Sequence, residues 1–254
     1  MVTLNTLVAD SLSMRFGGLV AVNDFSMAIP RGEICAVIGP NGAGKSTLFN
    51  LIAGELVPTA GDVFLDAERI SGLPSHAVAR RGVARTFQSV HLFQSMTVAE
   101  NVQVGADRYE RLHLLSALTP FRGDTEQARC AQARAAGAMA IVGVGHLADQ
   151  NVGALSVGQH HLVAVARALA AEPKLLLLDE PAAGLAESEI EVLANAILRA
   201  RESGATVLLV EHNVSFVMRL CDHVVVMHFG RKIADGTPND VRNNQAVIEA
   251  YLGT

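Results

Sequence analysis

A short glycine-rich loop contains residue types that could hold phosphate. The stretch GPNGAGKST, residues 39–47, fits the spacing G-x-x-x-x-G-K-[ST]. Its glycines let successive backbone N–H groups point at phosphate oxygens, and Lys45, one of three lysines in the chain, adds a full positive charge. The Ser46 hydroxyl is suited to Mg²⁺, the usual companion of nucleotide phosphates. The loop therefore predicts a nucleotide site with Mg²⁺, formed by Gly39, Pro40, Asn41, Gly42, Ala43, Gly44, Lys45, Ser46 and Thr47.

Two acidic residues end a second stretch, LLLLDE, at residues 175–180. Its apolar part is short enough to be a buried strand, so Asp179 would reach the edge of a sheet and hold Mg²⁺ there, usually through water. Glu180 follows at once and could orient or deprotonate an attacking water molecule. A strand that simply ends in acidic residues is common, but the phosphate loop favours the catalytic interpretation.

Two weaker observations concern the base of the nucleotide. The chain has no N-K-x-D stretch, which would specify guanine. Phe16, in the stretch MRFGG ahead of the phosphate loop, is an aromatic side chain that could stack on adenine. An aromatic residue near a turn is more often part of the core, so these residues alone leave the role of Phe16 open.

The composition limits the other functions that are open to the chain. Half of its 254 residues are hydrophobic and the mean hydropathy is +0.31, yet no run of about 18 apolar residues could cross a bilayer. The first residues lack the basic start and long apolar stretch of a signal peptide, so we expect a cytosolic protein. The net charge of −5, without a basic cluster, disfavours nucleic acid as a ligand. The three cysteines, Cys35, Cys130 and Cys221, lack C-x-x-C spacing, and we expect all three to be small buried side chains.

Strand and helix patterns alternate along most of the chain. Residues 1–35 are typical of short strands, with turns at Gly17-Gly18 and at 30–32. Further strands are predicted at 34–38, 61–66, 175–179 and 206–212, helices at 46–54, 126–142, 162–170 and 189–204, a loop at 118–124, and a hairpin with its turn near Gly230. Such alternation predicts an α/β fold with a parallel-sheet core, an N-terminal antiparallel β subdomain and an inserted helical subdomain. We expect a single domain over 1–254, with the core in 1–89 and 160–236, helical subdomain 90–159 and a C-terminal helix in 237–254.

With these motifs, the chain resembles the ATP-binding subunits of ABC transporters along nearly its whole length. LSVGQ, residues 155–159, is similar to the signature motif of that family and precedes the LLLLDE strand at the family's spacing. The resemblance implies the P-loop NTPase class with a RecA-like core, and ATP and Mg²⁺ as ligands. It also implies roles for single residues: Phe16 stacks on adenine, Gln88 ligates Mg²⁺ with Ser46 and Asp179, Glu180 acts as general base and His212 senses the γ-phosphate.

The same resemblance implies a head-to-tail dimer. Each ATP would lie between the phosphate loop of one subunit and the signature of the other, where Ser156, Gly158 and Gln159 contact it. A helix N-terminus with free N–H groups is suited to phosphate. Because the γ-phosphate would hold the dimer together, hydrolysis would loosen it.

Three stretches carry a closer resemblance: GVARTFQSVHLFQSMTVAENV, LLLLDEPAAGL and DGTPNDVRNNQAVIEAYLG. They are similar to the ATPase subunits of branched-chain amino acid uptake systems, and the chain looks like the longer of their two ATPases. This implies integral-membrane permease subunits, a second ATPase subunit (a related chain or another copy), a solute-binding protein, and a peripheral location on the cytoplasmic face of the inner membrane. Substrates of the wider group include amides, urea and aromatic acids, so the solute stays open. The same chemistry would serve an exporter, so import is implied by the resemblance alone.

Three positions depart from the family pattern. Val157 stands where many signatures have a glycine, and His160-His161 replaces the usual glutamine and basic residue. A histidine pair could bind metal or respond to pH, but helical neighbours point in different directions, so two surface or interface side chains are favoured. Ala186 replaces the usual Asn or Asp after the LLLLDE strand, which could weaken coupling between two ATP sites.

Two rival functions remain open within this resemblance. One is a soluble ABC ATPase that acts on ribosomes or DNA, but such proteins usually carry two fused cassettes or a long coiled coil. The other is a non-catalytic subunit for ATP-gated assembly. The acidic charge disfavours the first, and an intact Glu180 disfavours the second.

Overall fold

Short apolar strands build a central sheet. The computed structural model describes residues 4–106 and 126–252, so the loop expected at 118–124 lies outside the described part. Within these residues the sheet contains β3 (Ile34–Ile38), β6 (Val83–Arg85), β7 (Leu175–Asp179), β8 (Thr206–Val210), β9 (His223–His228) and β10 (Arg231–Gly236). Their order is β10-β9-β3-β8-β7-β6, and all neighbours are parallel except the predicted hairpin of β9 and β10.

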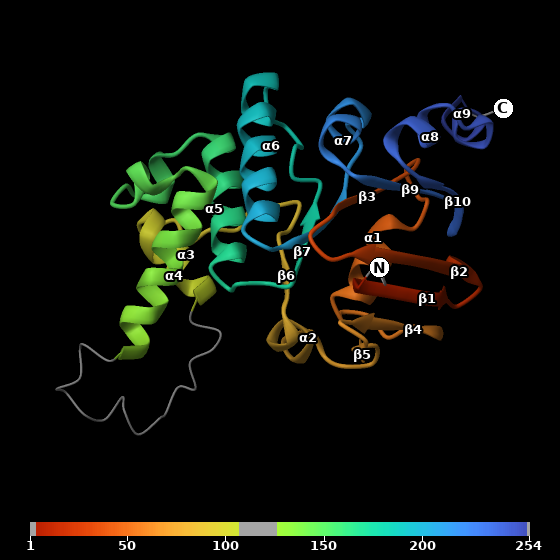
Figure 1. Ribbon diagram of the computed structural model, residues 1–254, viewed down its shortest axis with the longest axis horizontal. Coiled ribbons are helices and arrows are strands. Elements are labelled where there is room, and N and C mark those ends of the chain that lie inside the picture. Colours follow the sequence, from red (N-terminus) through yellow and green to blue (C-terminus); the bar gives the residue numbers. More distant parts are fainter. Residues whose placement is uncertain (1–3, 107–125, 253–254) are drawn as a thin grey trace.

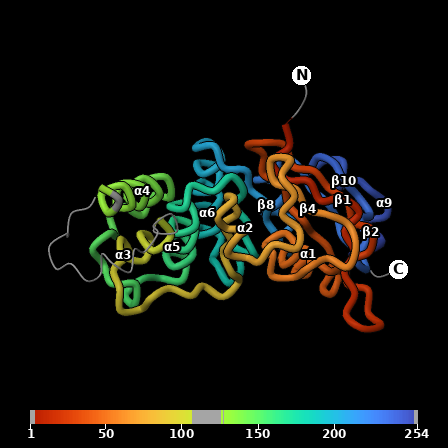
Figure 2. Tube along the Cα trace, turned by 90° about the horizontal axis from the view of Figure 1, so that it is seen from below, coloured from red at the N-terminus to blue at the C-terminus, as the bar shows by residue number. Residues whose placement is uncertain are grey.

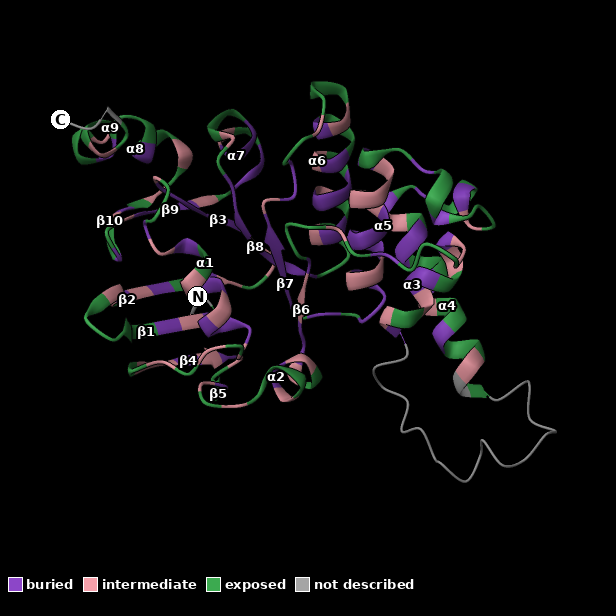
Figure 3. Ribbon diagram, turned by 180° about the vertical axis from the view of Figure 1, so that it is seen from behind, coloured by how far each residue is buried: buried purple, intermediate pink, exposed green. Residues whose placement is uncertain are grey.

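The middle strands are buried on both faces, which explains their nearly continuous apolar sequence. Every residue of β3, β7 and β8 is buried (Figure 3). Successive side chains of a strand point to opposite faces, so Ile34, Ala36 and Ile38 enter one core while Cys35 and Val37 enter the other. The strands predicted at 34–38 and 175–179 are confirmed at these bounds.

A second sheet is antiparallel and holds the N-terminal part of the chain, as predicted for the β subdomain. It contains β1 (Asn5–Phe16), β2 (Leu19–Pro30), β4 (Ala60–Leu65) and β5 (Glu68–Arg69), in the order β2-β1-β4-β5. The predicted turns at Gly17-Gly18 and at 30–32 bound β2, but β1 and β2 are each 12 residues long rather than short, with irregular pairing inside them. Ser11 and Asp24 both adopt φ 51° where the register shifts.

Helices cover both faces of the parallel sheet. They are α1 (Lys45–Ile52), α2 (Ser75–Arg81), α3 (Val98–Ala106), α4 (Glu126–Val142), α5 (Val157–Leu169), α6 (Glu187–Glu202), α7 (Val214–Leu220), α8 (Pro238–Arg242) and α9 (Gln245–Leu252), with 3₁₀ turns η3 (Gly145–Leu147) and η4 (Val152–Ala154). Figures 1 and 2 show α3, α4 and α5 gathered at one end of the molecule, with the antiparallel sheet at the other. Helix α1 lies between the two sheets, within the core that both share. In the described part of the chain, none of the helices is long and apolar enough to cross a membrane.

Several local predictions need correction. Helix α5 begins at Val157, inside the LSVGQ stretch, rather than at residue 162. The expected C-terminal helix is two helices, because the Asn244 side chain accepts a hydrogen bond from the N–H of Ala246 and starts a new helix there. Cys130 is exposed on α4, whereas Cys35 and Cys221 are buried as predicted.

Candidate nucleotide-binding site

The phosphate loop joins β3 to α1, as its strand–loop–helix pattern predicts. Strand β3 ends at Ile38 and α1 begins at Lys45. The Lys45 ammonium reaches back and donates hydrogen bonds to the carbonyl oxygens of Gly39, at 2.7 Å, and Pro40, at 3.0 Å. Burial lowers the pKa of Lys45, and the negative charge of Glu180 opposes that shift. The two carbonyl contacts hold the Lys45 side chain against the backbone of the loop.

Two glycines of the loop are required by close backbone approaches. Gly39 has φ 152°, and a Cβ atom there would lie 2.0 Å from the carbonyl oxygen of Met227 in β9. Gly44 has φ 105°, and a Cβ atom there would lie 2.2 Å from the carbonyl oxygen of Ala21 in β2. The loop is thus packed between two strands, where only glycine fits.

The N-terminus of α1 is open to an anion. The first backbone N–H groups of a helix have no partners within that helix. Gly44, the N-cap residue of α1, has no side chain to satisfy them, and Lys45, Ser46 and Thr47 line a cavity at this end. The positive end of the helix dipole therefore faces that cavity, an arrangement that suits phosphate.

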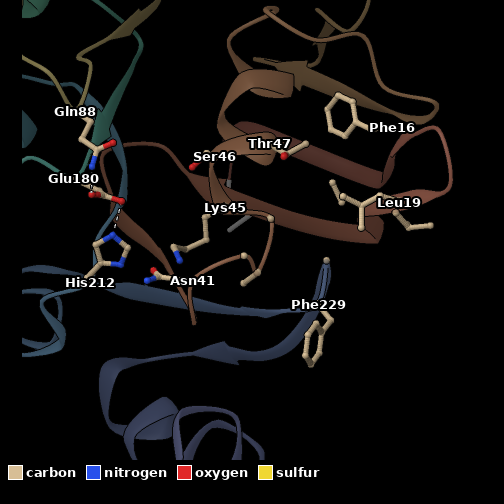
Figure 4. Close-up of a pocket in the computed structure, with 16 residues that line it drawn as sticks. Phe16, Leu19, Asn41, Lys45, Ser46, Thr47, Gln88, Glu180, His212 and Phe229 are labelled. Carbon is tan, nitrogen blue, oxygen red and sulfur yellow. Dashed lines mark hydrogen bonds and ion pairs between the residues drawn. The ribbon is translucent and has the colours of Figure 1, made fainter. Parts of the chain in front are cut away.

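The cavity beside the loop has a volume of about 610 Å³ (Figure 4), which is within the range of cofactor sites. The cavity brings together predicted residues from distant parts of the chain. Gly39 and Pro40 do not line it, but their carbonyl oxygens accept hydrogen bonds from Lys45, which does. The lining consists of Phe16, Leu19, Val20, Ala21, Asn41, Gly42, Ala43, Gly44, Lys45, Ser46, Thr47, Gln88, Glu180, His212, Phe229 and Gly230.

Phe229 is a lining residue that the sequence analysis missed. It lies in the β9–β10 turn with φ 44°, is 79% exposed, and stands across the cavity from Phe16 in Figure 4. The neighbouring Gly230 donates its N–H to the carbonyl of Ala43 and accepts from the N–H of Asn23, both at 2.8 Å. The turn is therefore attached to the phosphate loop and to β2. The sequence predicts the hairpin, but nothing local indicates which loop its turn meets.

Glu180 is held by side chains from two other segments. Its Oε2 accepts a hydrogen bond of 2.7 Å from the Gln88 amide, and its Oε1 contacts Nε2 of His212 (Figure 4). Glu180 has φ 47°, a left-handed conformation that is uncommon for a residue other than glycine. Its backbone N–H donates to the Val210 carbonyl at 2.9 Å, which holds that conformation next to the sheet. The three residues predicted as catalytic thus meet in one cluster.

A buried carboxylate, Glu211, supports the loops on which Glu180 and His212 lie. Its Oε1 accepts from the N–H of Ala182 at 2.7 Å, and its Oε2 accepts from the N–H groups of His212 at 3.0 Å and Asn213 at 3.3 Å. Burial raises the pKa of Glu211, and these hydrogen bonds oppose the shift. No local pattern in the sequence points to Glu211, because only the fold brings the two loops to one carboxylate.

Asp179 ends β7 as predicted but does not line the cavity. Its Oδ2 accepts a hydrogen bond of 2.8 Å from Nη2 of Arg85, and both side chains are 11% exposed. The oxygen atoms of Ser46, Gln88 and Asp179 suit Mg²⁺, which prefers oxygen ligands and usually also binds phosphate and water oxygens. The Ser46 hydroxyl lies in the cavity, and the Gln88 amide oxygen stays available because its nitrogen donates to Glu180.

The predicted signature residues lie apart from this cavity. Ser156 caps α5: its hydroxyl accepts from the N–H of Gln159 at 3.2 Å, and the Gln159 amide oxygen accepts from the N–H of Ser156 at 2.9 Å. Gly158 packs against Glu189, whose Oε1 would be 2.5 Å from a Cβ atom at this position. None of these three residues lines the phosphate-loop cavity.

Among the positions that depart from the family pattern, His160 and Ala186 have defined hydrogen-bond partners. His160 makes a 2.9 Å hydrogen bond with the Val152 carbonyl, and both His160 and His161 are half-buried. Burial lowers the pKa of His161. Ala186 is the N-cap residue of α6 and has no capping side chain, although its N–H donates to Glu189 at 3.0 Å. Val157 is 57% exposed.

A phosphate loop between a buried parallel strand and a helix, with an acidic pair ending another strand of the same sheet, defines a P-loop nucleotide-binding ATPase. The chain belongs to the ABC transporter family, whose profile matches residues 22–183, and residues 231–254 match a branched-chain amino acid ATP-binding cassette transporter profile.

Curated proteins and solved structures agree with this assignment. The chain is 43% identical to the high-affinity branched-chain amino acid transport ATP-binding protein BraF of Pseudomonas aeruginosa, over 97% of each chain. It is 36% identical to the lipopolysaccharide export system ATP-binding protein LptB of Escherichia coli, over 98% of this chain and 97% of that one. The ADP conformation of MJ1267, an ATP-binding cassette of an ABC transporter, matches with a TM-score of 0.86 and 32% identity, over 99% of this chain and 100% of that one.

Proposed function

We propose that this chain is the ATP-binding and ATP-hydrolysing subunit of an ABC importer, which powers uptake of branched-chain or other amino acids. The observation that carries the proposal is the Glu180 cluster: a carboxylate held by Gln88 and His212 in the lining of the phosphate-loop cavity. The likeness to BraF and the match of the C-terminal profile support an amino acid as the transported solute. The likeness to LptB keeps a different solute and the opposite direction as alternatives.

The residues of the cavity take separate roles in this proposal. Lys45 and the N–H groups at the start of α1 bind the phosphates, and Phe16 stacks on the adenine. Glu180 accepts the proton of the attacking water, while His212 contacts the γ-phosphate and Gln88 orients Glu180. When bound, Mg²⁺ would neutralise charge on the phosphates, and Ser46, Gln88 and Asp179 would hold it.

The second half of the site comes from another ATPase subunit. Ser156, Gly158 and Gln159 would contact the γ-phosphate of that subunit's nucleotide, because α5 begins there and its N-terminus suits an anion. Two observations support this arrangement: Ser156 is exposed, and it does not line the chain's own cavity. The partner subunit is a second copy or a related chain, and the dimer would dock on integral-membrane permease subunits at the cytoplasmic face of the inner membrane. A solute-binding protein would deliver the amino acid to those subunits.

The test of hydrolysis is the ATPase rate of the purified chain over a range of protein concentrations, with Glu180→Gln as the control. A rate per subunit that rises with concentration and vanishes in the control supports a catalytic homodimer. ATP binding without hydrolysis at any concentration would point to a related partner chain or to the permease subunits. Failure to bind ATP would contradict the proposal.

The test of the solute uses vesicles that contain the chain with its permease subunits. We expect ATP-dependent accumulation of labelled leucine in the presence of a solute-binding protein. Accumulation of urea or an aromatic acid instead would favour the alternative importers, and outward movement of substrate would contradict import.

A further inference from the structure

Arg85 is a partly buried arginine with partners on two elements of the site. It ends β6, and its side chain is 11% exposed. Nη2 donates to Asp179 at 2.8 Å, while Nη1 donates to Asn50 at 2.7 Å and to Glu55 at 2.9 Å. Asn50 lies in α1, the helix that begins at the phosphate loop, and Glu55 lies just after it. One guanidinium therefore connects the end of β7 to the helix behind the loop.

Two aromatic rings lie close to the same guanidinium. The Arg85 carbon Cζ lies 5.9 Å from the ring centre of Phe49 in α1 and 5.2 Å from that of Phe87. Its Nε is buried and has no hydrogen-bond partner among the described residues. Leaving a buried donor unpaired is unfavourable, so the other contacts of Arg85 must offset this cost.

Arg85 and Gln88 contact adjacent acidic residues. Arg85 donates to Asp179, and Gln88, on the same short segment, donates to Glu180. The N–H of Thr86 donates to the Leu177 carbonyl at 2.9 Å, so the start of this segment continues the pairing of β6 with β7. The segment is thereby aligned with both carboxylates at once. Arg85 occupies only Oδ2 of Asp179, which leaves Oδ1 for a further partner.

We propose that Arg85 is a positioning residue, which fixes the Asp179 carboxylate for Mg²⁺ and joins the Gln88 segment to the phosphate-loop helix. The proposal rests on the proposed function, because it concerns the metal of that same site. A carboxylate held by one oxygen needs no reorientation before it receives a cation or its water, and partners of this kind typically change metal affinity by about 10- to 100-fold.

The experiment measures binding of a fluorescent ADP analogue to the purified chain as the Mg²⁺ concentration is raised. In Arg85→Gln, we expect the Mg²⁺ concentration for half-maximal tightening to rise by about tenfold, with affinity in the absence of Mg²⁺ unchanged. Arg85→Lys keeps the charge but cannot donate from two nitrogen atoms to separate partners, so we expect a Mg²⁺ midpoint between those of the wild type and Arg85→Gln. Glu55→Gln is the matched control, since it neutralises an exposed partner of Arg85 and keeps the Asp179 pair, and its midpoint should equal that of the wild type.

The outcomes separate this inference from the proposed function. An unchanged or lower Mg²⁺ midpoint in folded Arg85→Gln would overturn the role of Arg85 while leaving the ATPase proposal intact. Wild-type protein whose nucleotide affinity did not respond to Mg²⁺ would instead count against the proposed function itself. If Arg85→Gln fails to fold, as judged by thermal unfolding, Arg85→Lys decides: a wild-type midpoint overturns the inference and a raised one supports it.

Discussion

Gln88 donates a hydrogen bond of 2.7 Å to Glu180, although 92 residues separate the two along the chain. The contact exists because Gln88 follows β6 and Glu180 follows β7, which are parallel neighbours in the sheet. Carboxyl ends of parallel strands lie at one edge, so residues just beyond them can meet. The position of Glu180 thus depends on the segment that bears Gln88 as well as on its own strand.

His212 is the other partner of Glu180, and we expect its loss to slow hydrolysis far more than binding. His212→Ala removes the side chain that contacts Oε1 of Glu180 and leaves that carboxylate free to turn. We expect the ATPase rate to fall by about 100-fold, with ATP affinity changed by less than about threefold. His212→Gln keeps a donor and should recover part of the rate. Equal rates for His212→Ala and wild type would contradict this role.

Gly39 is where a methyl group would be most damaging to the loop. In Gly39→Ala the new Cβ would lie 2.0 Å from the Met227 carbonyl oxygen, at a φ of 152° that disfavours side chains. We expect the free energy of unfolding to fall by about 3 kcal/mol, measured by urea denaturation. Gly18→Ala is the control, because a Cβ there meets nothing within 4 Å, and we expect a change of less than about 0.5 kcal/mol. Similar losses in both variants would show that packing against Met227 is not the cause.

Phe229 should contribute to nucleotide affinity without contributing to stability. Its ring is 79% exposed and lines the cavity opposite Phe16. Stacking of a base on an aromatic ring is worth about 1–3 kcal/mol, so we expect Phe229→Ala to weaken ADP binding by at least about fivefold in calorimetry. Val57→Ala removes another exposed apolar side chain, 64% exposed and outside the cavity lining, and should leave affinity unchanged. Unaltered ADP affinity in Phe229→Ala would exclude Phe229 from the base site.

Asp66 should make stability depend on acid pH. It pairs with Arg31 at 2.9 Å and Lys174 at 2.7 Å. Burial alone would raise the pKa of Asp66, but the hydrogen bonds from Lys174 and Arg31 outweigh it and hold the pKa below the usual 3.8. The carboxylate therefore stabilises the fold above about pH 4, and that contribution is lost as the pH falls through the folded pKa.

Asp66→Asn isolates this charge, because asparagine tolerates the φ of 47° at this position. We expect the variant to be less stable by about 1 kcal/mol near pH 7, since the partners are exposed, and the difference to disappear as the pH falls through the folded pKa of Asp66. Urea denaturation across this pH range measures it. Asp24→Asn is the control: Asp24 has φ 51° and no ion pair among the described residues, so we expect no pH-dependent difference. A difference in the free energy of unfolding between Asp66→Asn and the wild type that persisted at low pH would rule out an electrostatic cause.

Local chemistry made part of this protein predictable from its sequence. The phosphate loop, β3 and β7 depend on residues next to each other in the chain: glycines for a tight turn, a lysine for charge, and apolar runs for strands buried on both faces. Strand β6 escaped prediction because three residues are too few to show a pattern. Helix α5 starts five residues before the apolar pattern indicates, because the Ser156–Gln159 capping box begins the helix within the LSVGQ stretch.

The sequence by itself determined the phosphate loop, the acidic pair and the class of fold, because these follow from the conformational preferences of short segments. Only the tertiary structure decided that Phe229 borders the cavity, that Glu211 supports two loops, and that Arg85 holds Asp179. Each of these contacts joins residues far apart in the chain. Their partners are selected by strand order and by the packing of buried side chains, which no short segment specifies.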